Sequence, residues 1–401
     1  TLESDKRNVI QESYELEIAE DAAFDKKIYE SGKVKGDASA QIKPDNVKLE
    51  SQKKYFARVK VTAAGEETDW AETSFVTGIM DNKEWKAVFV SAEEETDRDN
   101  SKGTYVRGEF TVAKPVKEAF VSVTALGLYN FYLNGKKVGN DQLTPGWTSY
   151  RKHLCFQTYE VTDYLKEGKN AAGAILAAGW YKGKMGFEGL AKRRNHYGEN
   201  TALLAQMVIR YEDGTEETVV TDENWNGADA PVVFAEIYDG EIYDAAKEIK
   251  DWAEADCKDG QWKPVRKLDY DFSVLTGQGS GKVSLMDEVK PKEIFRTPAG
   301  DTVIDFGQNM SALIQVTAAG KKGDVIQLDC FEVLDSIGNV YLDNLRGAKE
   351  SLQYTFGEDG TITYRPSFTF MGFRYAKIVS FPGEPSLDNF TANAIHTNME
   401  R

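Results

Sequence analysis

The stretch LLAQMVIRYEDGTEETVV, residues 203–220, decides the fold class of this chain. Its apolar residues alternate with a period of two, and Asp213-Gly214 is typical of the tight turn that joins two antiparallel strands. Runs of the same kind recur every eight to twelve residues or so: YELEIA, YFARVKV, AFVSVTAL, LIQVTA and VIQLDCFEV. Period-two alternation turns one face of each strand toward a core. The sequence therefore predicts an all-β protein built from antiparallel β-sandwiches.

The length of 401 residues predicts about two to four domains, because one core rarely serves so long a chain. The polar stretch MDNKEW at residues 80–85 indicates one boundary, and the irregular stretch KPVRKLDYDFSVLTGQGSGK at 263–282 indicates a second. We expect three consecutive units, over residues 1–78, 84–285 and 286–397.

Charge narrows the class of partner. The formal net charge is −16 and the isoelectric point is about 4.9, so the long-range field would repel nucleic acid and anionic membranes. We therefore expect neither as a partner. No apolar run reaches the length of a membrane span, and TLESDKRNVI is not a signal peptide, which favours a cytoplasmic protein. Because the chain does not open on Met, a cut that removed a signal peptide remains an alternative.

A search for catalytic motifs finds no convincing candidate. His153, His196 and His396 are isolated, and three well-separated cysteines without a CxxC spacing indicate neither zinc nor a disulfide framework. No nucleophile elbow or dinucleotide fingerprint is present. Any two of the 65 acidic residues could be paired on paper, but the separation that defines a glycosidase pair cannot be read from sequence. We therefore assign no catalytic residue.

A sugar-binding signal remains. Sugars present apolar C–H faces and fixed hydroxyls, so their sites combine aromatic faces with amides and carboxylates. The segments around residues 128–150, 179–189, 193–200 and 238–245 supply such groups. The predicted ligand residues are Asn134, Asp141, Trp180, Asn195 and Glu241. The competing interpretation is structural: the tryptophan belongs to a core, and Asn134 starts a hairpin turn.

Several long motifs resemble one family. LGLYNFYLNGKKVGNDQLTPGWTSY at 126–150, QTYEVTDYL at 157–165 and GWYKG at 179–183 resemble the N-terminal domain of bacterial α-L-rhamnosidases. The segments VIDFGQNMSALIQVTAAGKKGDVIQL and YRPSFTFMGFRYAKI, from 303 and 364, resemble the concanavalin-like domain of the same enzymes. QESYELEIAED and the strands after it resemble their fibronectin type III-like domain.

The resemblance implies immunoglobulin-like and jelly-roll sandwiches in an inverting glycoside hydrolase that releases terminal α-L-rhamnose. It implies that catalysis belongs to a helical barrel beyond Arg401, so this chain is expected to be an inactive amino-terminal part. Its partners would be that barrel and a rhamnose-containing glycoside, with calcium as an optional cofactor. A lectin-like module and a purely architectural module are the alternatives. Relative to the family, the first sandwich is expected to lack an edge strand, leaving unpaired backbone groups near YELEIA.

Overall fold

The computed structural model describes residues 4–94, 100–185, 194–258, 260–279 and 281–398. Strands dominate these residues, and the α-helix α1 (Gly179–Lys182) is a single turn. The predicted all-β class is confirmed. None of the described helices is both long and apolar enough to cross a bilayer. Short 3₁₀ turns connect strands: η1 (Asn82–Glu84), η3 (Thr162–Tyr164), η4 (Ala245–Lys247), η5 (Phe272–Val274), η6 (Asp343–Leu345) and η7 (Leu387–Asn389).

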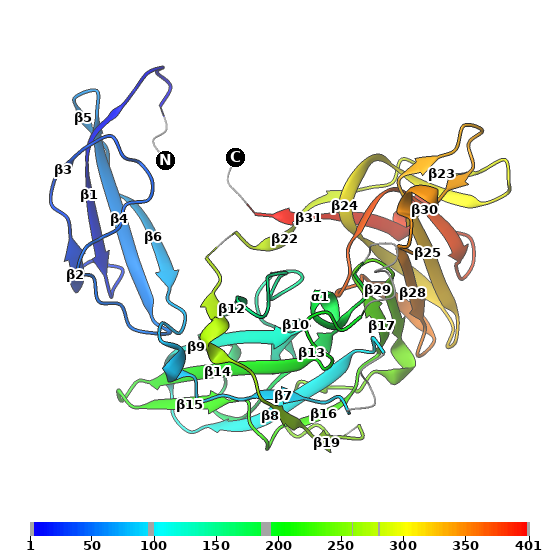
Figure 1. Ribbon diagram of the computed structural model, residues 1–401, viewed down its shortest axis with the longest axis horizontal. Helices are drawn as coiled ribbons and strands as arrows, with labels where there is room; N and C mark the ends of the chain where they lie inside the picture. Colours follow the sequence, from blue (N-terminus) through cyan, green and yellow to red (C-terminus); the bar gives the residue numbers. More distant parts are fainter. Residues whose placement is uncertain (1–3, 95–99, 186–193, 259, 280, 399–401) are drawn as a thin grey trace.

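The first unit forms one antiparallel sheet in its described residues, drawn in blue in Figure 1. Its strands are β1 (Gln11–Ala19), β2 (Lys27–Glu30), β3 (Val34–Lys35), β4 (Lys54–Ala63), β5 (Glu66–Glu67) and β6 (Ala71–Val76). The strand that contains YELEIA is β1, which pairs with β2 and β3 on one side and with β4 on the other. The expectation of unpaired backbone groups along it is wrong, because β2 and β3 fill that side in succession.

The two faces of this sheet differ in chemistry. On one face apolar residues pair across strands, as Leu16 does with Val59, and both stay partly exposed. On the other face the buried carboxylate of Glu17 forms ion pairs with Lys27 at 2.6 Å and Arg58 at 2.7 Å. A sheet with one apolar face is stabilised when a second layer covers that face. The described residues of this unit provide a single sheet.

The second unit is a sandwich of two sheets around one core. The six-stranded sheet has the order β11-β10-β13-β8-β16-β19, and the seven-stranded sheet β20-β7-β14-β9-β12-β21 with β15 on β14. The strands of the first are β8 (Thr104–Val112), β10 (Leu128–Leu133), β11 (Lys136–Lys137), β13 (Gly168–Ala177), β16 (Asn226–Asp229) and β19 (Lys263–Pro264). Those of the second are β7 (Phe89–Ser91), β9 (Val116–Leu126), β12 (Leu154–Glu160), β14 (Ala202–Tyr211), β15 (Glu216–Val220), β20 (Arg266–Leu268) and β21 (Leu275–Gly277).

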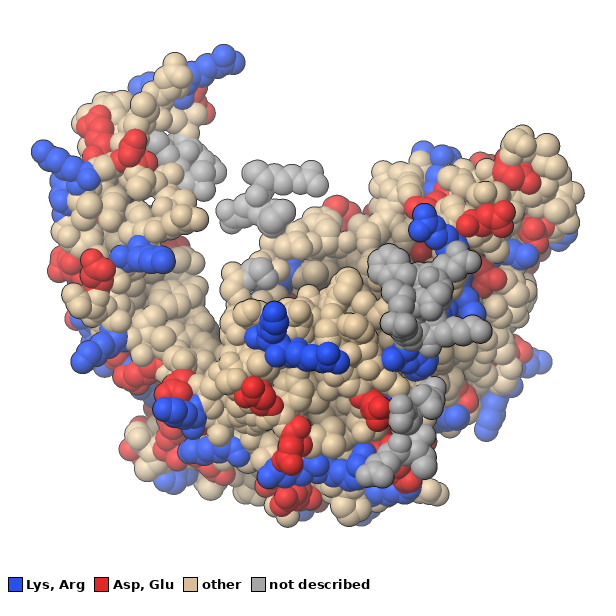
Figure 2. Space-filling view, in the orientation of Figure 1, with Lys and Arg blue, Asp and Glu red and all other residues tan. Residues whose placement is uncertain are grey.

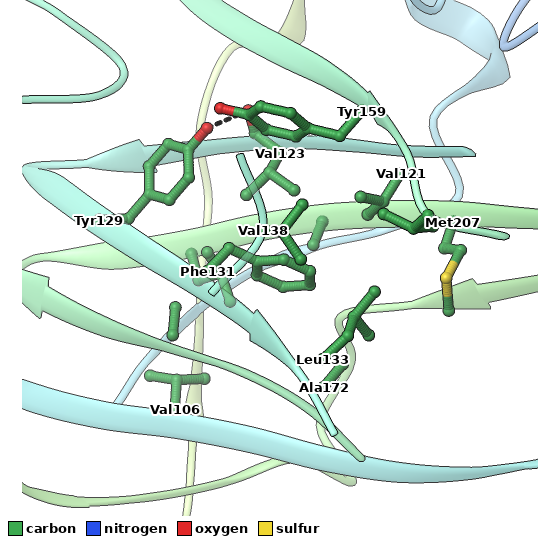
Figure 3. Close-up of a cluster of buried hydrophobic side chains, with 14 of the residues drawn as sticks. Val106, Val121, Val123, Tyr129, Phe131, Leu133, Val138, Tyr159, Ala172 and Met207 are labelled. Atoms are coloured by element: carbon green, nitrogen blue, oxygen red, sulfur yellow. Dashed lines mark hydrogen bonds between the residues drawn. The ribbon is translucent and has the colours of Figure 1, made fainter. Parts of the chain in front are cut away.

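The hairpin predicted from residues 203–220 is confirmed, since β14 and β15 pair from Gln206↔Val220 to Arg210↔Glu216. Alternate residues of the strands in both sheets enter the core between them, as the close-up in Figure 3 shows for Phe131 and Leu133 of β10 and Met207 of β14. Burying such side chains contributes roughly 1.5–3 kcal/mol each.

The third unit is built on a ten-stranded sheet in the order β17-β18-β28-β25-β30-β24-β31-β22, with β23 and β29 paired to β24. Its strands are β17 (Val232–Glu236), β18 (Gly240–Asp244), β22 (Val283–Val289), β23 (Glu293–Arg296), β24 (Thr302–Gly320), β25 (Val325–Phe331), β28 (Ser351–Thr355), β29 (Gly360–Tyr364), β30 (Met371–Ser380) and β31 (Phe390–Thr397). A small ribbon, β26 (Val333–Leu334) with β27 (Val340–Tyr341), forms a separate two-stranded sheet and packs against Phe331 and Tyr375 of the larger one. A second core lies within this sheet, around Phe306, Phe356 and Phe373.

The chain crosses between the second and third units. Strands β17 and β18 come from the range expected to belong to the second unit, yet β18 pairs in parallel with β28 of the third, from Gly240↔Ser351 to Asp244↔Thr355. The predicted division at residues 285 and 286 stays a prediction.

Figure 1 shows the second unit between the other two. In Figure 2 the basic and acidic side chains are interspersed over the visible face.

Candidate binding cleft

Asn134, one of the five predicted ligand residues, has a structural role. It has a positive φ of 46° in the turn between β10 and β11. Its amide nitrogen donates to the Tyr164 carbonyl and to Asn170 Oδ1, and its Oδ1 accepts from the Ala171 amide. Its hydrogen-bonding capacity is therefore used to fix the hairpin, as the structural interpretation anticipated.

Asp141 is also held by protein groups. Its side chain is 6% exposed and accepts a hydrogen bond of 2.7 Å from the Tyr159 hydroxyl. Lys282 Nζ lies 3.3 Å from the same carboxylate. A carboxylate buried in this way is satisfied by a hydrogen bond and a cation, as buried charges must be.

Trp180 and Asn195 lie near each other, at α1. Trp180 is buried and stacks parallel to the exposed Trp147, with 5.9 Å between ring centroids. The Asn195 amide donates to the carbonyl of Lys182, the last residue of α1. Its Oδ1 is buried and has no hydrogen-bond partner. Within the described part of the chain, no hydrogen bond joins any two of the five predicted residues.

Glu241 differs from the other four because it lines a cleft between the second and third units. It is 1% exposed and accepts hydrogen bonds from the Tyr364 hydroxyl at 2.7 Å and from the amides of Ser367 and Phe368. Burial raises the pKa of its carboxyl group. Glu241 therefore stabilises the junction of β18 with the segment after β29.

The cleft encloses about 770 Å³ and has two walls from different units. Asn130 and Tyr132 of β10 and Ile175 of β13 form one wall. The alternate residues of β10, such as Phe131, are buried in the core of the second unit, so the strand turns its other face to the cleft. Strands β18, β28 and β29 form the opposite wall.

The opposite wall is aromatic. Tyr243 stacks on Tyr354 with an interplanar angle of 8°, and the Tyr364 ring lies 4.8 Å from that of Tyr354. Burial raises the pKa of Tyr354 to about 12 and also raises the pKa of Tyr132 across the cleft. These phenols are therefore neutral hydrogen-bond donors at pH 7.

Asn130 presents an unused amide. The residue is 6% exposed, and its side chain has no hydrogen-bond partner among the described residues, although it lines the cleft. Buried polar side chains nearly always have a partner, so an unpartnered amide facing a cavity indicates water or a ligand. An amide on one wall and tyrosine rings on the opposite wall have the chemistry that recognises hydroxyl-rich molecules.

Sequence reasoning missed this cleft apart from Glu241. The signal was Asn130 itself, a polar residue at an apolar-strand position in LYNFYL, residues 128–133. The tyrosines of the opposite wall could not be grouped in advance, because they meet only through the pairing of β18 with β28.

A metal centre is not evident in the described residues, where no three His, Cys, Asp or Glu side chains cluster. The three cysteines are free thiols, and Cys330 is buried. Calcium stays a prediction.

Comparison with known families accounts for nearly the whole chain. Residues 1–81 match the Rha78A-like N-terminal immunoglobulin domain, 114–287 the α-L-rhamnosidase N-terminal domain and 295–396 the bacterial α-L-rhamnosidase concanavalin-like domain. The α-L-rhamnosidase of Streptomyces avermitilis is 40% identical over 300 residues, which are 74% of this chain and 29% of that protein. The chain belongs to the α-L-rhamnosidase family.

Other rhamnosidases match over a longer stretch. The α-L-rhamnosidase of Alteromonas sp. strain LOR is 32% identical over 99% of this chain and 44% of its own length. The crystal structure of the Aspergillus terreus α-L-rhamnosidase superposes with a TM-score of 0.92 at 30% identity, over 100% of this chain and 46% of that one. The S. avermitilis enzyme complexed with L-rhamnose gives 0.88 at 26% identity, over 98% and 55%. The chain thus spans 29% to 44% of the length of the curated relatives it matches.

Proposed function

We propose that this chain serves an α-L-rhamnosidase as a non-catalytic β region, which braces the domain where terminal α-L-rhamnose is hydrolysed. The observation that carries the proposal is the match of three successive rhamnosidase β domains to a chain that spans less than half of its curated relatives. Inverting hydrolysis needs an acid and a base roughly 6.5–9.5 Å apart across the scissile bond. In the cleft, the buried carboxylate of Glu241 is held by three hydrogen bonds, and Glu248 and Glu358 are exposed.

An aryl α-L-rhamnoside tests the non-catalytic part of this proposal. We expect the purified chain to release no aryl alcohol, while the S. avermitilis α-L-rhamnosidase, assayed in parallel, turns the substrate over. Release at a rate that scales with chain concentration would refute the proposal. Reading the gene past codon 401 tests the bracing role: an open frame that encodes a helical barrel supports it, and an immediate stop codon argues against it.

The unpartnered amide of Asn130 favours a second function, the binding of a rhamnoside in the cleft. One monosaccharide offers few atoms, so an affinity in the millimolar range, roughly, is expected. Titration with methyl α-L-rhamnoside, followed by NMR, should give saturable shifts that are lost in Asn130→Ala. Because the side chain of Asn130 makes no hydrogen bond to another described residue and Ala leaves the backbone pairing with Ile175 in place, this variant should keep the parent melting temperature.

Further variants separate this cleft from the sites chosen from sequence. Asp141→Ala and Trp147→Ala test the area around Asp141 and the Trp147–Trp180 stack. If either of them abolishes binding while Asn130→Ala does not, the ligand lies outside the cleft. Repeating the titration with a chelator tests the calcium prediction, and no response at tens of millimolar sugar leaves the bracing role as the function.

A further inference from the structure

Two cations lie near each other beside the hairpin end of the cleft, where Arg365 is a lining residue and its charge acts on Lys137. Lys137 of β11 is directly opposite Tyr132 of β10 in the hairpin register, so both side chains project from the same face. Tyr132 lines the cleft, and this face therefore points toward the third unit. From that unit, Arg365 lines the cleft directly after the end of β29.

Neither cation has a carboxylate partner among the described residues. The hydrogen bond that Lys137 Nζ makes goes to the backbone carbonyl of Asp141 and is long, at 3.4 Å. The Asp141 carboxylate is engaged by Tyr159 and Lys282. Arg365 Nη1 donates to Asn393 Oδ1 at 2.8 Å, which is a neutral acceptor.

Asn393 adds an unused donor. The residue is 4% exposed, its oxygen accepts from Arg365, and its Nδ2 is buried with no partner. Glu288 is paired with Asn393 in the β22–β31 register. Burial lowers the pKa of Arg365 and the charge of Glu288 only partly opposes that effect, because Glu288 is exposed and forms no ion pair with Arg365. Lys137 and Arg365 therefore lie close together without an ion pair, and the carboxylates of Asp141 and Glu288 compensate their charges only through space.

The protein retains these charges at a cost to its stability. Burial and the nearby charge of Arg365 lower the pKa of Lys137 to about 8, and burial lowers the pKa of Arg365. Partly desolvated like charges destabilise a folded protein unless they are compensated. Charged residues that lower the stability of the folded protein in this way are typical of binding sites rather than of residues that stabilise the fold.

We propose that this end of the cleft binds the anionic substituent, carboxylate or sulfate, of an acidic saccharide. Arg365 and Lys137 hold the anion, Asn393 orients the Arg365 guanidinium through their hydrogen bond, and Tyr132 with Asn130 contacts the hydroxyls of the same ring. The proposal rests on the cleft as a saccharide site and adds the class of sugar. Charge-assisted hydrogen bonds are about twice as strong as neutral ones, so an acidic sugar should bind at least about tenfold more tightly than its neutral analogue.

The experiment compares glucuronate, glucose 6-sulfate and glucose by NMR titration of the whole chain at low and high salt. We expect the acidic sugars to bind more tightly than glucose, with a preference that salt weakens. Glucuronate and the sulfate ester distinguish the two sources of negative charge. Lys137→Met and Arg365→Met should remove the preference. Lys114→Met is the matched control, because Lys114 pairs with Asp213 at the surface.

Stability provides a second readout. Lys137→Met should melt at the same temperature as the parent or higher, whereas loss of a structural lysine would lower it. Equal affinity for glucuronate and glucose overturns the inference, as does an acid preference that survives in both variants. If methyl α-L-rhamnoside binds in an Asn130-dependent way without any acid preference, the saccharide cleft stands and only this inference fails. Absence of binding by every sugar refutes both.

Discussion

Lys137 allows a test of charge burial at a single residue. Its folded pKa of about 8 lies below the ordinary 10.5, because of burial and Arg365, with Asp141 acting in the opposite direction. A lowered lysine pKa means that the charged form is disfavoured on folding, so the penalty is complete below pH 8 and disappears between about pH 8 and 10.5. Lys137→Met should therefore raise the free energy of unfolding by about 1–2 kcal/mol at pH 7. Urea denaturation of both proteins from pH 7 to 10 should show this gap closing; a gap that stays constant would contradict the assignment.

The Lys182–Glu93 pair presents the opposite case. Both side chains are 0% exposed, and Lys182 Nζ lies 2.8 and 2.9 Å from the two carboxylate oxygens. Removing one partner strands a buried charge, so Lys182→Met should cost about 3–5 kcal/mol of unfolding free energy. Denaturant melts measure this, with Lys114→Met, an exposed pair expected to change by less than about 1 kcal/mol, as control. The double variant Lys182→Met/Glu93→Gln should be less damaged than the single one, and equal damage would mean that stranded charge is not the cause.

Residue chemistry alone predicted part of the candidate site. Glu241 was selected and does line the cleft, whereas Asn134 is used by its own hairpin. The local sequence cannot distinguish these cases, because Asn134 begins an Asn-Gly turn signal and Glu241 directly follows an Asp-Gly one. Asn130 was overlooked since its neighbours in β10 are apolar, and only the packed structure shows that its amide has no partner.

At the scale of elements, the first sheet should be the least protected part of the chain. Strand β6 is largely exposed, and the apolar face around Leu16 and Val59 is only partly covered. Few buried contacts favour local opening. Hydrogen exchange followed by mass spectrometry should therefore show faster amide exchange in β1, β4 and β6 than in β9 or β14 of the second unit. Equal protection in a monomer would contradict this expectation.

The strands of the first unit could be predicted from the sequence, but whether a second layer covers their apolar face could not. Alternation in YELEIA and YFARVKV correctly indicates strands with one apolar face. It does not reveal whether another layer covers that face, because the covering residues need not be neighbours in sequence. The expected missing partner for β1 was wrong for the same reason: β2 and β3 are too short to stand out as strands.

At the scale of the molecule, the second and third units should unfold together. They are joined by the β18–β28 ladder, by the hydrogen bonds of Glu241 and by that from Thr369 to the Ile237 carbonyl. The first unit is attached more lightly, mainly where Gln52 donates to the Phe120 and Gln206 carbonyls. Calorimetry should thus resolve a small early transition and one larger later transition. Three separate transitions would show that the shared sheet does not couple the units.

The sequence predicts three units but does not indicate how they join. Composition shifts at residues 80–85 and 263–282 are visible in one dimension, whereas the parallel pairing of β18 with β28 links strands more than a hundred positions apart. Non-local pairing of this kind leaves no local pattern.

The crossing of the chain at β18 also constrains how genes of this family can recombine. Gly240 begins that strand with a φ of 103°, and a Cβ there would lie 1.8 Å from the Ser351 carbonyl oxygen. A middle unit transplanted from a relative brings its own version of this glycine and of Glu241 against a foreign Ser351 and Tyr364. Recombination at the irregular stretch 263–282 would therefore create hybrid proteins in which β18 and β28 do not fit each other. Evolution should keep the second and third units together, whereas the first unit is free to be replaced.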